Sequence, residues 1–396
     1  MLALLPNPHT GGLVSFSRRS FFQVAGAGAV GSLLAPFVSG RGLEALTLGD
    51  FHSGHGTPLH PGTIRLNSNE NPNGPGKVAF DGIHAAFVEA NRYPRSSETD
   101  LRAAIAAAFG LTSEHVQLGC GSTDILRASV YAYTGPDRPL VVASPTFESP
   151  GTDAKRIGAQ VREVPVTGDL KLDLDAMAVA ARGAGLVYLC NPNNPTSTVQ
   201  GAAAVKQFVA RTLKDSPATT ILIDEAYHEY VDDPSYATAI PLALENPRII
   251  IARTFSKVYG MAGLRIGYAL AQPATIEALR PCTLPNGVNE LGARGAIAAL
   301  GAKAHIERER VLNRAARSYT LKSLAAAGFP AADSQANFLM VNLRRDAQPF
   351  RDACKRDGVL VGRPFPPLDT YCRITIGTMD EMQHAVDIFK RALATA

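Results

Sequence analysis

The chain has 396 residues, of which 46% are hydrophobic and 19% charged, and its formal net charge is +4. This length and composition predict an ordinary globular protein of two domains. Lys and Arg form no long basic block with interleaved aromatic residues, so the sequence argues against a nucleic-acid partner.

The first 45 residues resemble a twin-arginine export signal. Arg18 and Arg19 are adjacent and precede an uncharged, Ala/Gly-rich run from Gln23 to Gly40. Such a run is too rich in glycine for a stable membrane span. We therefore expect export of the folded protein to the periplasm. The alternatives are an ordinary N-terminal helix on a cytoplasmic protein, or an uncleaved anchor.

Two patterns in this region suggest binding sites but lack the required context. Residues 26–31 match GxGxxG, but no strand precedes them and no acidic residue follows at the right distance, so we reject dinucleotide binding. His52, His55 and His60 lie in a Gly/Pro-rich segment without periodicity, so we expect no metal site. The five cysteines form no CxxC pair and predict no disulfide framework.

Short apolar runs alternate with helical segments from residue 64 to about residue 275. This alternation predicts an α/β fold with a largely parallel sheet. Strands are expected near residues 64–67, 116–118, 140–143, 160–165, 184–190, 220–223, 249–252 and 266–270, and helices at 99–109 and 125–133.

Four strands are each followed by a residue that can carry chemistry. Phe147, Asn194, Asp224 and Lys257 come, in this order, after four of the strands expected between residues 140 and 252. In open α/β sheets, ligands collect beyond the carboxyl ends of parallel strands. We therefore expect these four side chains to meet at one site.

Lys257 is the expected centre of this site. It lies on a loop between two buried strands, where partial desolvation lowers the pKa of an amine and suits Schiff-base chemistry. Thr254 and Ser256 add hydroxyls, and Arg265 adds a positively charged fork. These residues predict a phosphate site beside a reactive amine.

A second anion-binding segment precedes the helix expected at 125–133. Gly121, Ser122 and Thr123 are small, which lets the backbone approach an anion, and the free N–H groups of the new helix point toward it. We interpret these residues as the main phosphate cradle. A plain helix cap is the alternative.

The pattern changes after about residue 275. Long Ala/Arg/Leu helices, such as those in 291–324, lead into a smaller α+β unit with strands near 338–343, 359–361 and 373–376. The expected organisation is a signal at 1–45, an N-terminal arm and part of a small domain at 46–90, a large domain at 91–280, and an interdomain helix with the small domain at 281–396.

The lysine segment, ARTFSKVYGMAGLRIGY at 252–268, resembles that of the fold-type I pyridoxal-phosphate aminotransferases of class I/II, and most closely the histidinol-phosphate aminotransferase branch. The segments around Asn69, Tyr93 and Asn194 resemble further motifs of that branch. The resemblance covers residues 60–395. It implies a large domain with a mainly parallel seven-stranded sheet, a smaller α+β domain, and a homodimer with shared sites.

The resemblance also implies pyridoxal 5′-phosphate as cofactor and transamination between a small amino donor and a 2-oxo acid. Lys257 would bind the cofactor covalently and move the proton, Asp224 would keep the ring nitrogen protonated, and Tyr227 would hold the 3-oxygen. Tyr93 would reach the partner subunit's cofactor phosphate. The implied cofactor-binding set is Tyr93, Gly121, Ser122, Thr123, Phe147, Asn194, Asp224, Tyr227, Thr254, Ser256, Lys257 and Arg265.

Asn69, Asn337, Arg363 and Arg373 are the implied substrate-binding residues. Arg373 would bind a carboxylate and Arg363 a substrate phosphate, which favours histidinol phosphate with 2-oxoglutarate. Asn73, however, stands where many members of the branch have an aromatic residue. The alternatives are an aromatic or other amino acid aminotransferase, a phosphothreonine-type decarboxylase of the same fold, and a binding protein without turnover.

Overall fold

A computed structural model describes residues 62–395 of the chain. The predicted export signal at residues 1–45 lies outside these residues. Between residues 62 and 395, no helix is both long and apolar enough to cross a membrane.

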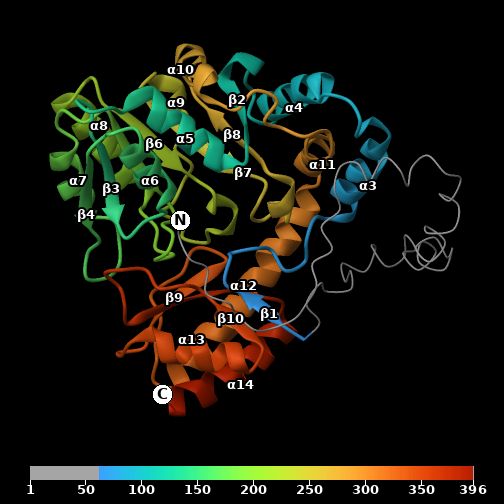
Figure 1. Cartoon of the computed structure of the whole chain (residues 1–396), viewed down its shortest axis with the longest axis vertical. Coiled ribbons are helices and arrows are strands. Elements are labelled where there is room, and N and C mark those ends of the chain that lie inside the picture. Colours follow the sequence, from blue (N-terminus) through green and yellow to red (C-terminus); the bar gives the residue numbers. More distant parts are fainter. Residues whose placement is uncertain (1–61, 396) are drawn as a thin grey trace, which may run out of the picture. The chain divides into compact units, whose positions relative to one another are not determined.

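A seven-stranded sheet forms the centre of the larger part of the molecule (Figure 1). β8 runs antiparallel to the other six strands of this sheet, which all point in the same direction. The prediction of an α/β fold with a mainly parallel seven-stranded sheet is therefore confirmed. In spatial order the strands are β2 (Val116–Cys120), β8 (Ile266–Leu270), β7 (Ile249–Thr254), β6 (Thr220–Asp224), β5 (Leu186–Cys190), β3 (Leu140–Ser144) and β4 (Val161–Pro165).

Helices cover both faces of this sheet, which explains why its strands are continuous apolar runs. Successive residues of β3 point to opposite faces, so Val141 packs in one core and Val142 in the other. The first core receives α4 (Arg95–Ala108), α7 (Leu174–Ala180), α8 (Ala202–Asp215), α9 (Ile240–Glu245) and α11 (Glu290–Leu300). The second core receives α5 (Ser122–Tyr133), α6 (Ser149–Arg156) and α10 (Pro273–Leu279).

A separate core lies in the smaller part. There β1 (Ile64–Leu66) pairs in parallel with β10 (Val359–Val361), and β9 (Phe338–Asn342) pairs antiparallel with β11 (Tyr371–Thr375). Leu66, Leu339 and Phe389 share this core, so segments from both ends of the described chain build it. The predicted domain boundaries stay a prediction. The helices of this part are α12 (Lys303–Ala326), α13 (Ala347–Arg356) and α14 (Met379–Thr395).

Several element boundaries differ from the sequence-based prediction. Helix α5 begins at Ser122, three residues before the expected start, because Gly121 with φ 71° turns the chain directly into the helix. The segment 291–324 divides into α11 and α12, with Gly301 as the C-cap of α11. The remaining short elements are α3 (Lys77–Ala85), η1 (Ala86–Glu89), η2 (Ser113–His115), η3 (His228–Tyr230), η4 (Ala262–Leu264) and η5 (Arg280–Cys282).

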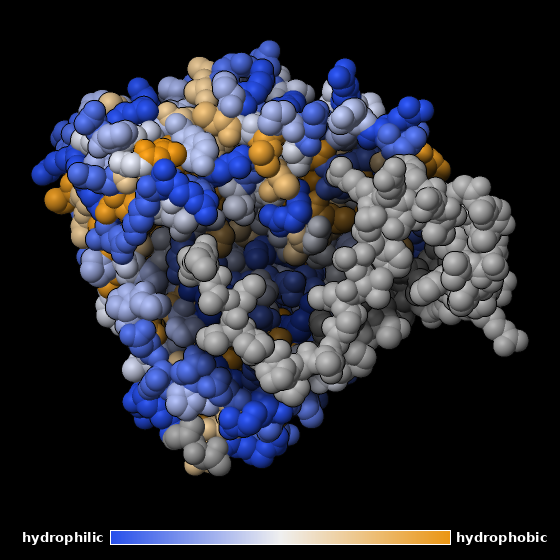
Figure 2. All heavy atoms as spheres, viewed as in Figure 1, coloured by the Kyte–Doolittle hydropathy of each residue, from blue (hydrophilic) through white to orange (hydrophobic). Residues whose placement is uncertain are grey.

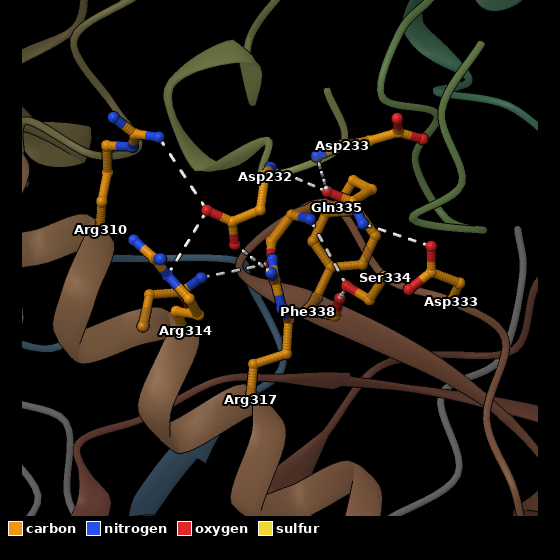
Figure 3. Close-up of polar contacts among 11 residues, drawn as sticks. Asp232, Asp233, Arg310, Arg314, Arg317, Asp333, Ser334, Gln335 and Phe338 are labelled. Atoms are coloured by element: carbon orange, nitrogen blue, oxygen red, sulfur yellow. Dashed lines mark hydrogen bonds and ion pairs between the residues drawn. The ribbon is translucent and has the colours of Figure 1, made fainter. Parts of the chain in front are cut away.

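An ionic cluster joins the segment after η3 to the smaller part (Figure 3). The Asp232 carboxylate lies 2.7 Å from a guanidinium nitrogen of Arg317, 3.4 Å from Arg314 and 3.9 Å from Arg310, all on α12. The side-chain oxygen of Gln335 accepts hydrogen bonds from the backbone N–H groups of Asp232 and Asp233. This cluster therefore fixes the chain just beyond Tyr227 against the smaller part.

A buried ion pair holds the carboxyl ends of β6 and β7 together. The Glu225 side chain accepts two hydrogen bonds from the Arg253 guanidinium, at 3.0 and 2.6 Å, and a third from the backbone N–H of Ala239 at 2.7 Å. Both side chains of the pair are at least 90% buried. Each residue is next to one with a predicted cofactor role, Asp224 and Thr254.

Replacing one partner of this buried pair should destabilise the protein strongly. Glu225→Gln leaves the Arg253 charge buried and uncompensated, and we expect it to lower the free energy of unfolding by about 3 kcal/mol. The matched control is Glu163→Gln, because Glu163 forms an exposed ion pair with Lys155; its effect should be below about 1 kcal/mol. Urea unfolding of both variants measures the difference, and equal midpoints would contradict the prediction.

Candidate active site

A cavity of about 340 Å³ lies at the carboxyl ends of the parallel strands, between the larger and the smaller part. Figure 2 shows the described surface hollowed between these parts, with hydrophilic residues along the walls. The cavity brings together the predicted site residues from both parts, except Gly121, Tyr93 and Asn337. The predicted residues that line it are Asn69, Ser122, Thr123, Phe147, Asn194, Asp224, Tyr227, Thr254, Ser256, Lys257, Arg265, Arg363 and Arg373.

Lys257 reaches the cavity from the loop that follows β7. Its Nζ donates a hydrogen bond of 3.3 Å to the backbone carbonyl of Asn69 and lies 5.3 Å from the centre of the Tyr227 ring. Burial, followed by the positive charge of Arg373, lowers the pKa of Lys257 to about 8. The neutral amine, which a nucleophile or a base requires, is therefore far more populated near neutral pH than in an exposed lysine.

Asp224 ends β6 and is buried at the bottom of the cavity. Burial raises the pKa of its carboxyl group to about 6, against hydrogen bonds from the Tyr188 hydroxyl and the backbone N–H of Ala226 that favour the charged form. A carboxylate at this place can pair with a protonated ring nitrogen of a ligand.

One part of the cavity wall has the features of an anion-binding site. Ser122 and Thr123 form the first turn of α5, whose free N–H groups carry the positive end of the helix dipole. Arg265 donates a hydrogen bond of 3.3 Å to the Ser256 hydroxyl. A Cβ atom at position 121 would lie 2.1 Å from the Arg265 guanidinium, so Gly121 allows the close approach even though it does not line the cavity.

Arg373 lines the cavity and is 8% exposed. Its guanidinium donates hydrogen bonds of 2.7 Å to the side-chain oxygen of Asn194 and to the carbonyl of Asn67. Its Nε has no hydrogen-bond partner among residues 62–395. The bond with Arg373 uses the oxygen of the Asn194 amide, so the amide nitrogen can still donate to a ligand oxygen.

Arg363 lies at the mouth of the cavity and is half exposed. It forms an ion pair of 2.6 Å with Glu148, and its guanidinium lies 4.3 Å from the centre of the Phe365 ring. The same ring lies 4.8 Å from the guanidinium of Arg373. Phe365 therefore contacts two positively charged side chains that line the cavity with it.

Asn69 connects the smaller part to the reactive residues. Its backbone is left-handed, with φ 54°, and its side-chain nitrogen donates a 3.1 Å hydrogen bond to the Tyr227 hydroxyl. The Thr375 hydroxyl donates to the Asn69 side-chain oxygen at 3.1 Å. Because the Tyr227 hydroxyl only accepts here, its own hydrogen remains available for a ligand oxygen. The substrate role of Asn69 stays a prediction.

Besides Gly121, two predicted residues lie outside the cavity. Asn337 is buried behind Asn69 and donates a 3.1 Å hydrogen bond to the Asn69 carbonyl, the group that also accepts from Lys257. Tyr93 lies just before α4 and is 76% exposed. Its predicted role is in the partner's site, which a single chain does not test.

Three residues that contact the site were not predicted from the sequence. Tyr188 contacts Asp224, Glu148 contacts Arg363, and Thr375 contacts Asn69. A signal for Tyr188 was available, because it is a tyrosine within an otherwise aliphatic strand that precedes the Asn–Pro turn. Glu148 and Thr375 gave no signal, because nothing local distinguishes them from surface or strand residues.

The cavity fits pyridoxal 5′-phosphate. The first turn of α5 with Arg265 and Ser256 would hold the phosphate, Asp224 the ring nitrogen, Tyr227 and Asn194 the 3-oxygen, and Phe147 would face the ring. Lys257 supplies the amine that this aldehyde needs. When bound, the cofactor supplies a carbonyl carbon and an electron-accepting ring.

Comparisons with known proteins agree with this geometry. A model of the family "Aminotransferase class I and II" matches residues 61–389. A histidinol-phosphate aminotransferase of Symbiobacterium thermophilum is 37% identical over 333 residues, which cover 83% of this chain and 90% of that protein. An aromatic amino acid aminotransferase of Streptomyces coelicolor is 34% identical over 335 residues, with 83% and 89% covered.

The fold is also similar to solved structures. The histidinol-phosphate aminotransferase of Sinorhizobium meliloti, solved in complex with pyridoxal-5′-phosphate, superposes with a TM-score of 0.79 at 26% identity, covering 94% of this chain and 99% of that one. The predicted fold type and cofactor are confirmed. The chain belongs to the aminotransferase class I and II family and is a pyridoxal-phosphate-dependent transaminase.

Proposed function

We propose that this transaminase takes the amino group of L-histidinol phosphate and passes it to 2-oxoglutarate. The observation that carries the proposal is the pair of arginines beside Phe365: the guanidinium carbons of Arg363 and Arg373 lie 4.3 Å and 4.8 Å from its ring centre. A phosphate group carries up to two negative charges, and 2-oxoglutarate carries two carboxylates. Two guanidinium groups at one end of the cavity match either ligand.

The residues divide the reaction between them. Arg373, buried beside Asn194, orients the anionic group next to the reacting carbon, and Arg363 meets the second charge at the mouth. Lys257 Nζ, with its lowered pKa, accepts the proton from the substrate carbon and returns it on the cofactor side. Asp224 would keep the ring nitrogen of the bound cofactor protonated, and the cofactor would supply an electron-accepting ring.

An aromatic amino donor is the second candidate, and the ion pair at the mouth favours it. Glu148 already neutralises Arg363 at 2.6 Å, so a donor without a distal anion could bind and leave that pair intact. Asn73, which stands where many members of the branch have an aromatic residue, donates a 2.7 Å hydrogen bond to Glu309 on α12 and so is held against the smaller part.

A phosphothreonine-type decarboxylase is a further alternative. It would use the same cofactor residues and would release carbon dioxide without an oxo-acid acceptor.

We also propose that two copies of the chain form a homodimer with shared sites. Apolar side chains are exposed along α3, η1 and the segment that follows, where Val78 is 55%, Phe87 58%, Val88 80% and Tyr93 76% exposed. Burial of these side chains against a second copy would remove apolar surface from water. It would also bring Tyr93 to the partner's phosphate site.

The N-terminal segment supports export through the twin-arginine route, with the cofactor bound before export. Arg18 and Arg19 and the weakly apolar run after them carry this proposal.

The substrate proposal predicts a selective effect at the mouth. Arg363→Gln should raise the KM for L-histidinol phosphate about tenfold or more and change the KM for phenylalanine little, because only the first donor loses a charge-assisted hydrogen bond. Single-turnover absorbance of the bound cofactor, followed by recovery with 2-oxoglutarate, measures both donors. Arg182→Gln, in a similarly exposed ion pair with Asp215, is the control. A protein that reacts only with phenylalanine would favour the second candidate.

The dimer proposal predicts complementation between two defective chains. Tyr93→Ala should weaken retention of pyridoxal phosphate, and Lys257→Ala should abolish covalent attachment. When the two variants are mixed, half of the sites in mixed dimers regain both residues, and tight cofactor retention should return in that fraction. Sedimentation analysis checks the assembly itself. A monomeric protein, or a Tyr93→Ala variant that retains cofactor normally, would contradict the proposal.

The export proposal predicts a change of compartment. Cells that express the full chain should release it with the periplasmic fraction, and the double variant Arg18→Lys/Arg19→Lys should stay in the cytoplasm. Cytoplasmic retention of both proteins would reject export by this route.

A further inference from the structure

Tyr188 lies in the middle of β5 and is 1% exposed. Cys190, two residues later, pairs in register with Asp224 on the neighbouring strand β6. Because side chains alternate along a strand, Tyr188 lies on the same face as Cys190. Its hydroxyl reaches the last residue of β6 and donates a 2.8 Å hydrogen bond to Oδ2 of Asp224.

Asp224 has no ion-pair partner within 4.0 Å among residues 62–395. Its two hydrogen bonds come from neutral donors, the Tyr188 hydroxyl at 2.8 Å and the backbone N–H of Ala226 at 3.1 Å. Lys257 acts on it only at longer range, and Glu225 opposes its charge. The Cys190 thiol donates instead to the carbonyl of Pro192.

We propose that Tyr188 is a positioning residue, whose hydroxyl orients the Asp224 carboxylate and keeps it ionised toward the ring nitrogen of the cofactor. A hydrogen bond to a carboxylate favours its charged form, and in a buried site no water replaces a lost donor. Tyr188 therefore helps to decide where the proton between Asp224 and the ring nitrogen resides. Tyr188 does not line the cavity and so acts on a ligand through Asp224.

This role explains a polar residue in a buried strand. Burial disfavours the charged form of Asp224 more than any other influence on it, and the hydrogen bond from Tyr188 is the largest influence in the opposite direction. Without that bond, the carboxyl group would bind a proton more tightly and take it from the ring nitrogen. The ring would then accept electrons less well.

The test uses the whole enzyme loaded with pyridoxal phosphate that carries ¹⁵N in its ring. In Tyr188→Phe, the ¹⁵N chemical shift at constant pH should move from the protonated toward the neutral pyridine value. A change of about one pKa unit at Asp224 alters the ratio of the two proton positions about tenfold. The kcat should fall with little change in KM. The control is Tyr319→Phe, which changes a partly buried tyrosine at the core of the smaller part and should leave the chemical shift unchanged.

A second variant covers the case in which Tyr188→Phe does not fold or hold cofactor. 3-Fluorotyrosine at position 188 keeps the ring and is a stronger donor, so it should move the ¹⁵N shift in the opposite direction, toward the protonated form. An unchanged shift in the variant that folds, or shifts of the same sign in both, would overturn the proposal. The readout does not depend on which amino donor the enzyme uses.

Discussion

The parallel registration of β5, β6 and β7 is the constraint on which the site depends. Cys190 pairs with Asp224, and Asp224 with Ala252, so the three strands end side by side at one edge of the sheet. Every loop that leaves this edge starts near the same point. Lys257 and Asn194 therefore reach the cavity whatever the length of the helices between the strands. The buried ion pair of Glu225 with Arg253 links the ends of β6 and β7 at the same edge.

The site holds charges that are not fully neutralised by their neighbours. Asp224 has only neutral donors, and Arg373 keeps an unpartnered Nε among the described residues. Burial raises the pKa of the first group and lowers that of the second and of Lys257. Burial disfavours the charged form of each of these groups, and a bound phosphate, ring nitrogen or carboxylate would supply a partner of opposite charge or a hydrogen bond. The same feature that weakens the fold locally thus favours the ligands.

The smaller part supplies the predicted substrate residues Arg363 and Arg373, and contacts that hold Asn69 beside the reactive lysine. Thr375, Asn337 and Tyr227 all contact Asn69, whose carbonyl receives the Lys257 amine. A movement of the smaller part that displaced Asn69 would therefore change the hydrogen bond between its carbonyl and the Lys257 amine. At the mouth, Arg363 is paired with Glu148 of the larger part, so an anionic ligand competes with a residue of the protein itself.

The sequence by itself determined the sheet and the residues at its edge. Apolar runs predict buried strands, and a parallel order brings Asn194, Asp224 and Lys257 together, so local pattern was sufficient for them. The tertiary structure alone decided the contacts around them. Tyr188 meets Asp224 only through strand registration, Thr375 meets Asn69 across 306 residues of sequence, and Glu148 meets Arg363 across two parts of the molecule. Such contacts depend on how distant segments pack, and no local pattern of residue types records that packing.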